Sequence, residues 1–182
     1  PFVGAPKFHL MDQNGCGEND PNGPVFDPVH GVIHHFYQAH LAALNQSGGR
    51  VWGHFVSKDF VHWAQMPVAL WNGIDASVWP PIPTEYDNLR LPSGSAGVVD
   101  GAGQANSTKG VVLVSPGRSS HGLFLAQAVP ANYASDPLLA NWSKPGYNPI
   151  TNASNRDPST PWKTPSGEWR LTTFASRVYG VA

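Results

Sequence analysis

Short apolar stretches recur at even intervals along this chain, and turn-forming segments separate them. Such stretches occupy residues 51–57, 96–99, 111–115, 123–128 and 169–176. The 182 residues include 19 glycines and 18 prolines, which interrupt the interior of helices but suit turns between short strands. The sequence therefore predicts an all-β domain without long helices. Strand spacing alone leaves a sandwich, a barrel and a propeller as alternatives.

The N-terminal part of the chain carries a hairpin pattern. Residues 25–27 and the apolar run 32–38 flank Pro28-Val29-His30-Gly31, whose proline and glycine favour a turn. No linker-like stretch interrupts the strands that follow, so one structural unit is expected. His34 and His35 are adjacent in the predicted strand. Their side chains therefore face opposite sides, which disfavours chelation of one metal ion.

Composition excludes several classes of protein. The net charge is −1 and 13% of the residues are charged, so we expect no concentrated basic face for nucleic acid or for an anionic membrane. No apolar run reaches the length of about 18 residues that a transmembrane helix needs. The single cysteine, Cys16, excludes an internal disulfide and a cysteine-based zinc site. Aromatic residues make up 11% of the chain, which is typical of a packed domain with an aromatic-lined site.

Two Asp-Pro motifs are the strongest functional signal. Asn19-Asp20-Pro21-Asn22-Gly23 precedes the apolar run 32–38, and Asn155-Arg156-Asp157-Pro158 lies far downstream. Alone, Asp-Pro-Asn-Gly is ordinary turn chemistry. Four further motifs follow in order, at residues 36–38 (Phe-Tyr-Gln), 52–63 (beginning Trp-Gly-His), 93–96 (Ser-Gly-Ser-Ala) and 136–139 (Asp-Pro-Leu-Leu). Together they resemble glycoside hydrolase family 32, the β-fructosidases that cleave sucrose, inulin and levan.

The resemblance covers nearly the whole chain, from Phe8 to Trp169, and selects the five-bladed β-propeller among the all-β folds. At roughly 40–60 residues per four-stranded blade, the chain supplies about three blades and cannot close the ring. We therefore expect residues 1–182 to be the N-terminal part of a family 32 catalytic propeller. The remaining blades and the family's C-terminal β-sandwich would lie outside this chain. The missing initiator Met and signal segment also lead us to expect a longer parent protein.

The resemblance assigns catalytic roles to two aspartates. Asp20 would be the nucleophile that attacks the anomeric carbon of a fructosyl unit. Asp157 would stabilise the transition state by accepting hydrogen bonds from fructose hydroxyls as positive charge develops. The family's acid/base glutamate lies in a downstream Glu-Cys dipeptide, whereas the only cysteine here is Cys16, preceded by Gly15. The third carboxylate is therefore expected outside these residues.

The same resemblance suggests five substrate-binding residues. Asn19 and Gln38 would hydrogen-bond sugar hydroxyls, and Trp52 would form an apolar wall against the sugar ring. Ser95 lies in a segment that lines the site in relatives, although a serine there also suits a tight strand end. Arg156 would hold the neighbouring aspartate ionised and oriented, with a structural turn pair as the alternative.

The chain also departs from the family pattern. Glu18 precedes Asn19 where an aromatic residue is usual nearby, Pro92 replaces a tryptophan and Gly97 replaces a threonine. These differences bear on sugar selectivity more than on the reaction. Glu18 would raise the pKa of Asp20 if the two carboxylates converge, and otherwise points to solvent.

No cofactor or metal is implied. Residues 12–23 begin like a calcium loop, but the position that needs a bidentate glutamate is Gly23. Glycosidic bonds can be hydrolysed by carboxylates alone.

The sequence thus predicts a fragment of a retaining β-fructofuranosidase that hydrolyses terminal β-D-fructofuranosyl residues of sucrose or fructans. The alternative is a non-catalytic carbohydrate-binding propeller that has lost the acid/base glutamate. The expected partner is a small or oligosaccharide substrate, not nucleic acid or a membrane. A secreted or vacuolar location is expected, and four Asn-x-Ser/Thr sequons are compatible with it, at Asn45, Asn106, Asn141 and Asn152. Substrate preference, hydrolysis versus fructosyl transfer, and oligomeric state are left open.

Overall fold

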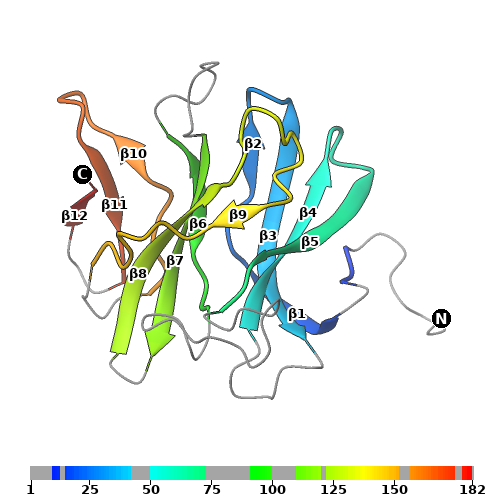
Figure 1. The fold of residues 1–182 in the computed structure, drawn as a ribbon, viewed down its shortest axis with the longest axis horizontal. Coiled ribbons are helices and arrows are strands. Elements are labelled where there is room, and N and C mark those ends of the chain that lie inside the picture. The colour runs from blue at the N-terminus through cyan, green and yellow to red at the C-terminus, as the bar shows by residue number, and fades with distance from the viewer. Residues whose placement is uncertain are drawn as a thin grey trace.

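The computed structural model describes residues 10–12, 15–41, 50–72, 91–99, 110–119, 122–151, 156–174 and 178–181 of the chain. These residues form twelve β-strands in three antiparallel sheets and contain no helix (Figure 1). The predicted all-β class is confirmed. The described part of the chain also contains no helix long and apolar enough to cross a membrane.

The first sheet carries the N-terminal motif. Its strands are β1 (Gly15–Pro21), β2 (Val25–Asp27), β3 (Val32–Leu41), β4 (Arg50–Ser57) and β5 (Trp63–Leu70). They are ordered β1-β3-β4-β5, and β2 also pairs with β3, so β1 and β2 form one interrupted edge strand. The predicted hairpin is confirmed, since the Gly31 N–H donates to the Asp27 carbonyl at 2.9 Å across the β2–β3 turn.

The second and third sheets follow in chain order. The second contains β6 (Ser95–Val98), β7 (Val111–Ser119), β8 (Gly122–Pro130) and β9 (Trp142–Ser143). The third contains β10 (Trp162–Lys163), β11 (Trp169–Thr172) and β12 (Val178–Val181). The apolar stretches of the sequence therefore correspond to β4, β6, β7, β8 and β11. Five strands were not predicted: β1 has no apolar alternation, β5 contains Pro67, and β9, β10 and β12 are only two to four residues long.

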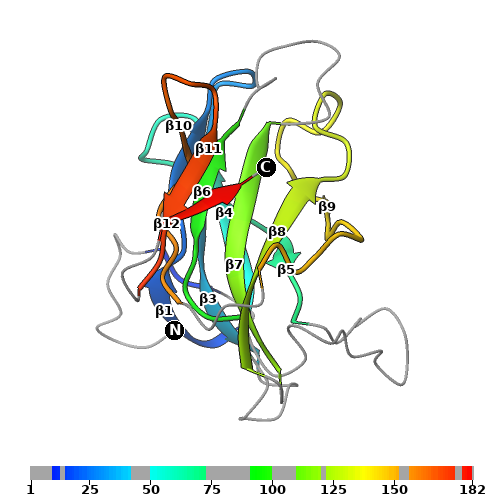
Figure 2. The same ribbon diagram turned by 90° about the vertical axis from the view of Figure 1, so that its left-hand side faces the viewer.

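The three sheets stand side by side like blades, and β6 of the second sheet lies between β10 of the third sheet and β2 of the first (Figures 1 and 2). Gly23 follows β1 with φ +134°, and a Cβ there would lie 2.3 Å from the Ala96 backbone nitrogen of β6. A Cβ on Gly97 would lie 2.9 Å from the Pro161 ring, just before β10. Small residues therefore allow the inner edges of successive sheets to approach at backbone distance, as the centre of a propeller requires.

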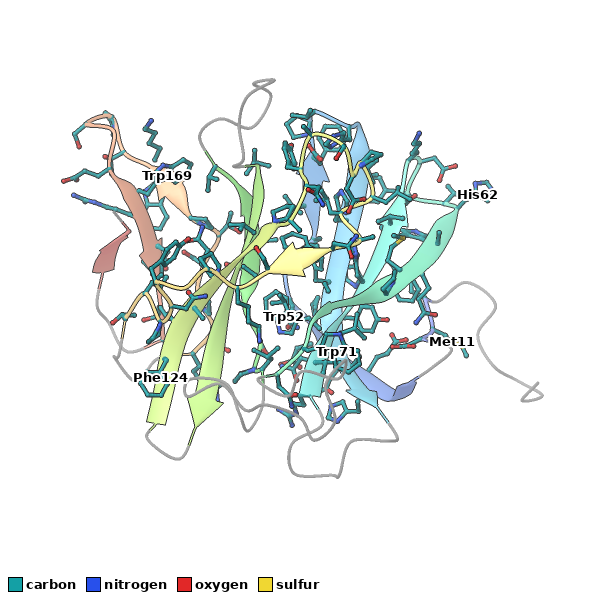
Figure 3. All side chains as sticks on the ribbon, in the orientation of Figure 1. Met11, Trp52, His62, Trp71, Phe124 and Trp169 are labelled. Carbon is teal, nitrogen blue, oxygen red and sulfur yellow. The ribbon has the colours of Figure 1, made fainter. Side chains whose placement is uncertain are left out.

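The main core lies between the first and second sheets. It contains Phe36, Trp52, Leu70, Leu91 and Ala96, which are all at least nine-tenths buried. Trp52 is fully buried and lies in the interior of the structure (Figure 3). The strand residues that face this core therefore fix how the two sheets sit against each other.

A buried carboxylate joins the first sheet to the segment between β8 and β9. Asp27 accepts hydrogen bonds from the Tyr133 hydroxyl at 2.6 Å, from His30 Nδ1 at 2.6 Å and from the Val29 N–H at 2.9 Å. Burial opposes ionisation of Asp27, but these three donors outweigh it and lower its pKa. The charge is thus compensated, and Asp27 links the two sheets.

Candidate active site

Asp20 lies on a β-bulge of the innermost strand in the first sheet. In the β1–β3 ladder, Asn19 pairs with Gln38 and Pro21 pairs with Tyr37, so Asp20 is the extra residue. A bulge bends the strand and changes the direction of one side chain. The local sequence explains it, because Pro21 has no N–H to continue the ladder. The predicted nucleophile is therefore exposed at the inner edge of the sheet.

The carboxylate of Asp20 is held by two side chains, one from β3 and one from the segment that precedes β6. Ser93 donates its hydroxyl proton to Asp20 Oδ2, and Gln38 Nε2 lies 3.4 Å from the same oxygen. Gln38 Nε2 also donates to Ser93 Oγ at 2.7 Å. Gln38 is 1% exposed, so its amide is fixed by packing. Gln38 therefore lies beside Asp20, and its predicted contact with sugar hydroxyls stays a prediction.

The surroundings of Asp20 favour its ionised form. The hydrogen bond from Ser93 is the main cause of a lowered pKa, followed by the backbone N–H of Asp20 itself. Partial burial opposes these effects, and the positive charges of Arg50 and Arg156 add to them. Asp20 is therefore a carboxylate at neutral pH, which is the state that attack on an anomeric carbon requires.

Arg156 and Asp157 form an adjacent ion pair before the third sheet. Arg156 Nε lies 2.7 Å from Asp157 Oδ2, and both side chains are about half exposed. Asp157 has φ 53°, in the left-handed region that non-glycine residues rarely adopt and that occurs often at functional sites. The Arg156 pKa is raised mainly by Asp157 and also by Asp20. The guanidinium therefore acts electrostatically on both predicted catalytic aspartates.

Asp20 lies on β1 of the first sheet and Asp157 lies just before β10 of the third sheet, so the whole second sheet separates them in chain order. Although they are far apart in sequence, both aspartates interact with the charge of Arg156 at the inner edges of the sheets. Ser95 Oγ donates to the Ser159 carbonyl at 2.8 Å, which ties β6 to the segment that follows Asp157.

Trp52 and Ser95, which were predicted to contact the sugar, are both buried and bond other parts of the protein. Trp52 is 0% exposed, and its indole N–H donates to the Pro92 carbonyl at 3.1 Å. A ring covered by protein cannot form a wall against a sugar, so this assignment is corrected: Trp52 supports the backbone beside Ser93. Ser95 is 5% exposed and bonds Ser159, so it joins two sheets and does not line the site.

Ser93 is the site residue that the sequence reasoning missed. It lies two positions before Ser95 in the same Ser-Gly-Ser segment, and both were equally plausible from the sequence. β6 begins at Ser95, so Ser93 belongs to the approach to the strand. The signal that would have favoured Ser93 over Ser95 as a site residue is its position just before the strand begins.

Asn19 and Glu18 point toward other partners. Asn19 is exposed, and its Oδ1 lies 2.5 Å from His40 Nε2. Glu18 accepts a hydrogen bond from the backbone N–H of Asp12. The pKa of Asp20 is lowered, mainly by its hydrogen bond from Ser93, which is the opposite of the raised value that convergence with Glu18 would produce.

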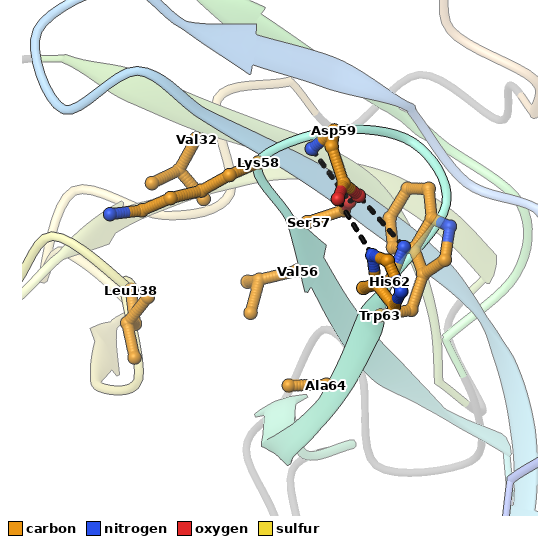
Figure 4. A pocket seen from close by; sticks show the side chains of 9 residues that line it. All are labelled: Val32, Val56, Ser57, Lys58, Asp59, His62, Trp63, Ala64 and Leu138. Carbon is orange, nitrogen blue, oxygen red and sulfur yellow. Dashed lines mark hydrogen bonds and ion pairs between the residues drawn. The ribbon is translucent and has the colours of Figure 1, made fainter.

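A separate pocket of about 320 Å³ lies at the β4–β5 turn (Figure 4). Its lining residues are Val32, Val56, Ser57, Lys58, Asp59, His62, Trp63, Ala64 and Leu138. None of them is a predicted site residue. Asp59 at its rim accepts from the N–H groups of Val61 and His62, which shapes the turn. Within the described ranges, no three His, Cys, Asp or Glu residues are placed to hold a metal ion.

Comparisons with known proteins identify the family of this chain. The model of the glycosyl hydrolases family 32 N-terminal domain matches residues 9–180. A fructan 6-exohydrolase from Triticum aestivum is 34% identical over 185 residues, covering 93% of this chain and 27% of the relative. An insoluble-isoenzyme beta-fructofuranosidase from Daucus carota is 37% identical over 184 residues, covering 97% of this chain and 27% of the relative.

The fold comparison gives the same result. The crystal structure of fructan 1-exohydrolase IIa from Cichorium intybus matches with a TM-score of 0.75 and 29% identity, over 95% of this chain and 31% of that one. Radial sheets with aspartates at their inner edges thus define a propeller-type glycoside hydrolase domain. The chain belongs to glycoside hydrolase family 32, and its sheets are part of the five-bladed propeller, as predicted. It spans about a quarter of the length of the curated relatives it matches.

Proposed function

We propose that this chain is the N-terminal part of a retaining β-fructofuranosidase that releases terminal fructosyl units from sucrose or fructans. The observation that carries the proposal is the ionised, exposed carboxylate of Asp20, held by Ser93 and Gln38 and acted on by the Arg156–Asp157 pair. The names of the relatives, which are beta-fructofuranosidases and a fructan exohydrolase, support this substrate class.

In the proposed reaction, Asp20 attacks the anomeric carbon of the fructosyl unit. The bond to the leaving oxygen breaks, and a covalent fructosyl-enzyme ester forms. The positive charge that develops on the fructosyl ring strengthens its hydroxyl hydrogen bonds to Asp157. Arg156 keeps the Asp157 carboxylate oriented. Water then hydrolyses the ester and regenerates Asp20.

The proton for the leaving oxygen would come from a glutamate in the part of the protein that this chain does not contain. Without a positioned acid the leaving group departs as an alkoxide, which typically costs about 10²–10⁴ in rate. The 182 residues alone are therefore expected to be inactive on sucrose.

An oligosaccharide is a plausible substrate as well as sucrose. The Cichorium intybus fructan 1-exohydrolase IIa has been crystallised with 1-kestose, and that structure matches this chain with a TM-score of 0.73 and 30% identity. The site residues described here belong to the fructosyl-binding end.

We also propose passage through a secretory pathway to the cell exterior or the vacuole. The relatives include vacuolar and insoluble isoenzymes. Asn141, one of the sequon residues, is exposed just before β9. The other three, Asn45, Asn106 and Asn152, lie outside the described residues.

The test is fructose release from sucrose, 1-kestose, inulin and levan by the full-length protein. Asp20→Asn and Asp157→Asn should each lower kcat by about three orders of magnitude or more, with circular dichroism unchanged. Glu168→Gln is the control, because Glu168 pairs with Arg170 on the exposed surface of the third sheet. Full activity in Asp20→Asn would show that the nucleophile is misassigned. Sugar binding without turnover by the wild type would favour the non-catalytic alternative.

A further inference from the structure

Phe174 is an exposed aromatic residue beside the catalytic ion pair. Its side chain is 69% exposed, so burial in the core does not account for it. Its backbone N–H donates to the Arg156 carbonyl at 2.9 Å, forming an isolated antiparallel bridge. The bridge places the phenyl ring next to the Arg156 side chain. The guanidinium carbon lies 5.5 Å from the ring centroid.

Arg156 needs such a neighbour if it is to stay in one position. Its side chain is 63% exposed, and its salt bridge to Asp157 is open to solvent. Exposed ion pairs hold long side chains weakly, because water screens them and the side-chain entropy opposes them. The negative face of an aromatic ring attracts the planar guanidinium as well, and so restricts the directions that it samples.

The restriction matters because one cation acts on two aspartates. The Arg156 guanidinium bonds Asp157 Oδ2 directly and interacts electrostatically with Asp20. If the side chain swung into solvent, both interactions would weaken together. The ring of Phe174 is the described group that packs on the guanidinium without competing for its hydrogen bonds.

We propose that Phe174 is a positioning residue of the fructosyl site, whose ring holds the Arg156 guanidinium beside both Asp157 and Asp20. This inference rests on the proposed function for its catalytic consequence. Phe174 touches none of the reacting atoms and acts only through Arg156. A purely structural role in the β-bridge would instead depend on its backbone, which substitutions of the ring leave in place.

The test uses the full-length protein and five variants. Phe174→Leu removes the π face but keeps an apolar side chain, and it should lower kcat/KM by about 2- to 5-fold, equivalent to about 0.5–1 kcal/mol. The loss should fall on kcat more than on KM. Phe174→Trp should restore the wild-type values. Phe60→Leu is the matched control, since Phe60 is 70% exposed at the distant β4–β5 turn and should have no effect on kcat/KM.

The pH profile and a double-mutant cycle separate positioning from stability. The acid limb of kcat/KM should move to higher pH in Phe174→Leu, because the Arg156 charge lowers the pKa of Asp20. Arg156→Gln should move it further. Phe174→Leu should have no additional effect in the Arg156→Gln background if it acts through Arg156. Additive losses, or an unmoved acid limb, would overturn the proposal.

A measurement that does not depend on catalysis tests the positioning role of Phe174 separately from the proposed function. The side-chain Nε–H signal of Arg156 in an NMR spectrum should carry a ring-current shift that Phe174→Leu abolishes and Phe174→Trp retains. Observing that shift in a protein inactive on every fructoside would support the contact while refuting the proposed function. An active enzyme in which Phe174→Leu leaves the Arg156 signal unchanged would refute the positioning role.

Discussion

The buried pair His34 and His54 should make this domain lose stability in acid before its carboxylates titrate. Both side chains are 0% exposed, and His34 Nδ1 lies 2.9 Å from His54 Nε2 across β3 and β4. Burial lowers the pKa of His34 to about 4 and that of His54 well below its usual range. Asp27 and Asp136 attract a proton on His34, but their effect is smaller than that of burial.

Two neighbouring histidines oppose protonation of the pair. His30 disfavours a charge on His34, and His35 disfavours one on His54. The pair therefore stays neutral in the folded protein and shares one proton between the facing nitrogens. A second proton between these nitrogens would make one ring an imidazolium and direct two N–H groups at each other, without water to solvate the charge.

The sign and size of the effect follow from proton linkage. Between pH 6.5 and about 4, the unfolded chain binds a proton at His34 and the folded chain does not. Stability therefore falls as pH falls, by about 1.4 kcal/mol for each pH unit below 6.5. His34 alone should cost about 3 kcal/mol near pH 4, and His54 acts in the same direction. That is a large share of the roughly 5–15 kcal/mol that stabilises a typical domain.

Urea unfolding followed by tryptophan fluorescence measures the effect in steps from neutral pH down to about pH 4.5. The His34→Gln/His54→Gln double variant should show a shallower dependence on pH, since glutamine retains hydrogen bonding but does not titrate. Phe36→Leu is the control, because the Phe36 ring stacks on His54 at 4.5 Å and its loss should lower stability equally at every pH. An unchanged slope in the double variant would refute the reasoning. If that variant does not fold, imidazole nitrogen shifts of the wild type near pH 5 should show both rings neutral, and charged rings would refute it.

Two further predictions concern the site and the propeller centre. Ser93→Ala removes the hydrogen bond that most lowers the pKa of Asp20, so the acid limb of kcat/KM of the full-length protein should move to higher pH. An unmoved limb would mean that Ser93 does not control that carboxylate. Gly23→Ala should lower the free energy of unfolding by more than about 2 kcal/mol in urea titrations, because the new Cβ would meet the Ala96 backbone and φ is +134°. A stable Gly23→Ala variant would show that the inner strands can separate.

The sequence by itself determined the class of fold and indicated the two aspartates that we propose as catalytic. Glycine and proline frequencies and apolar spacing exclude long helices, because these are local properties of the backbone. The two Asp-Pro motifs indicated Asp20 and Asp157, since local turn chemistry and residue order are visible in one dimension. The β2–β3 hairpin was likewise predictable, because its turn and its apolar strand are contiguous.

Only the tertiary structure decided which neighbouring side chains face those aspartates. Ser93 and Ser95 are chemically identical, and the start of β6 and the position of the third sheet determine that the first bonds Asp20 and the second bonds Ser159. Trp52 has the flat apolar ring that suits a sugar-binding wall, but packing between two sheets buries that ring. Such assignments depend on contacts between segments far apart in sequence. No local pattern encodes them, because the contacts exist only once the sheets have packed.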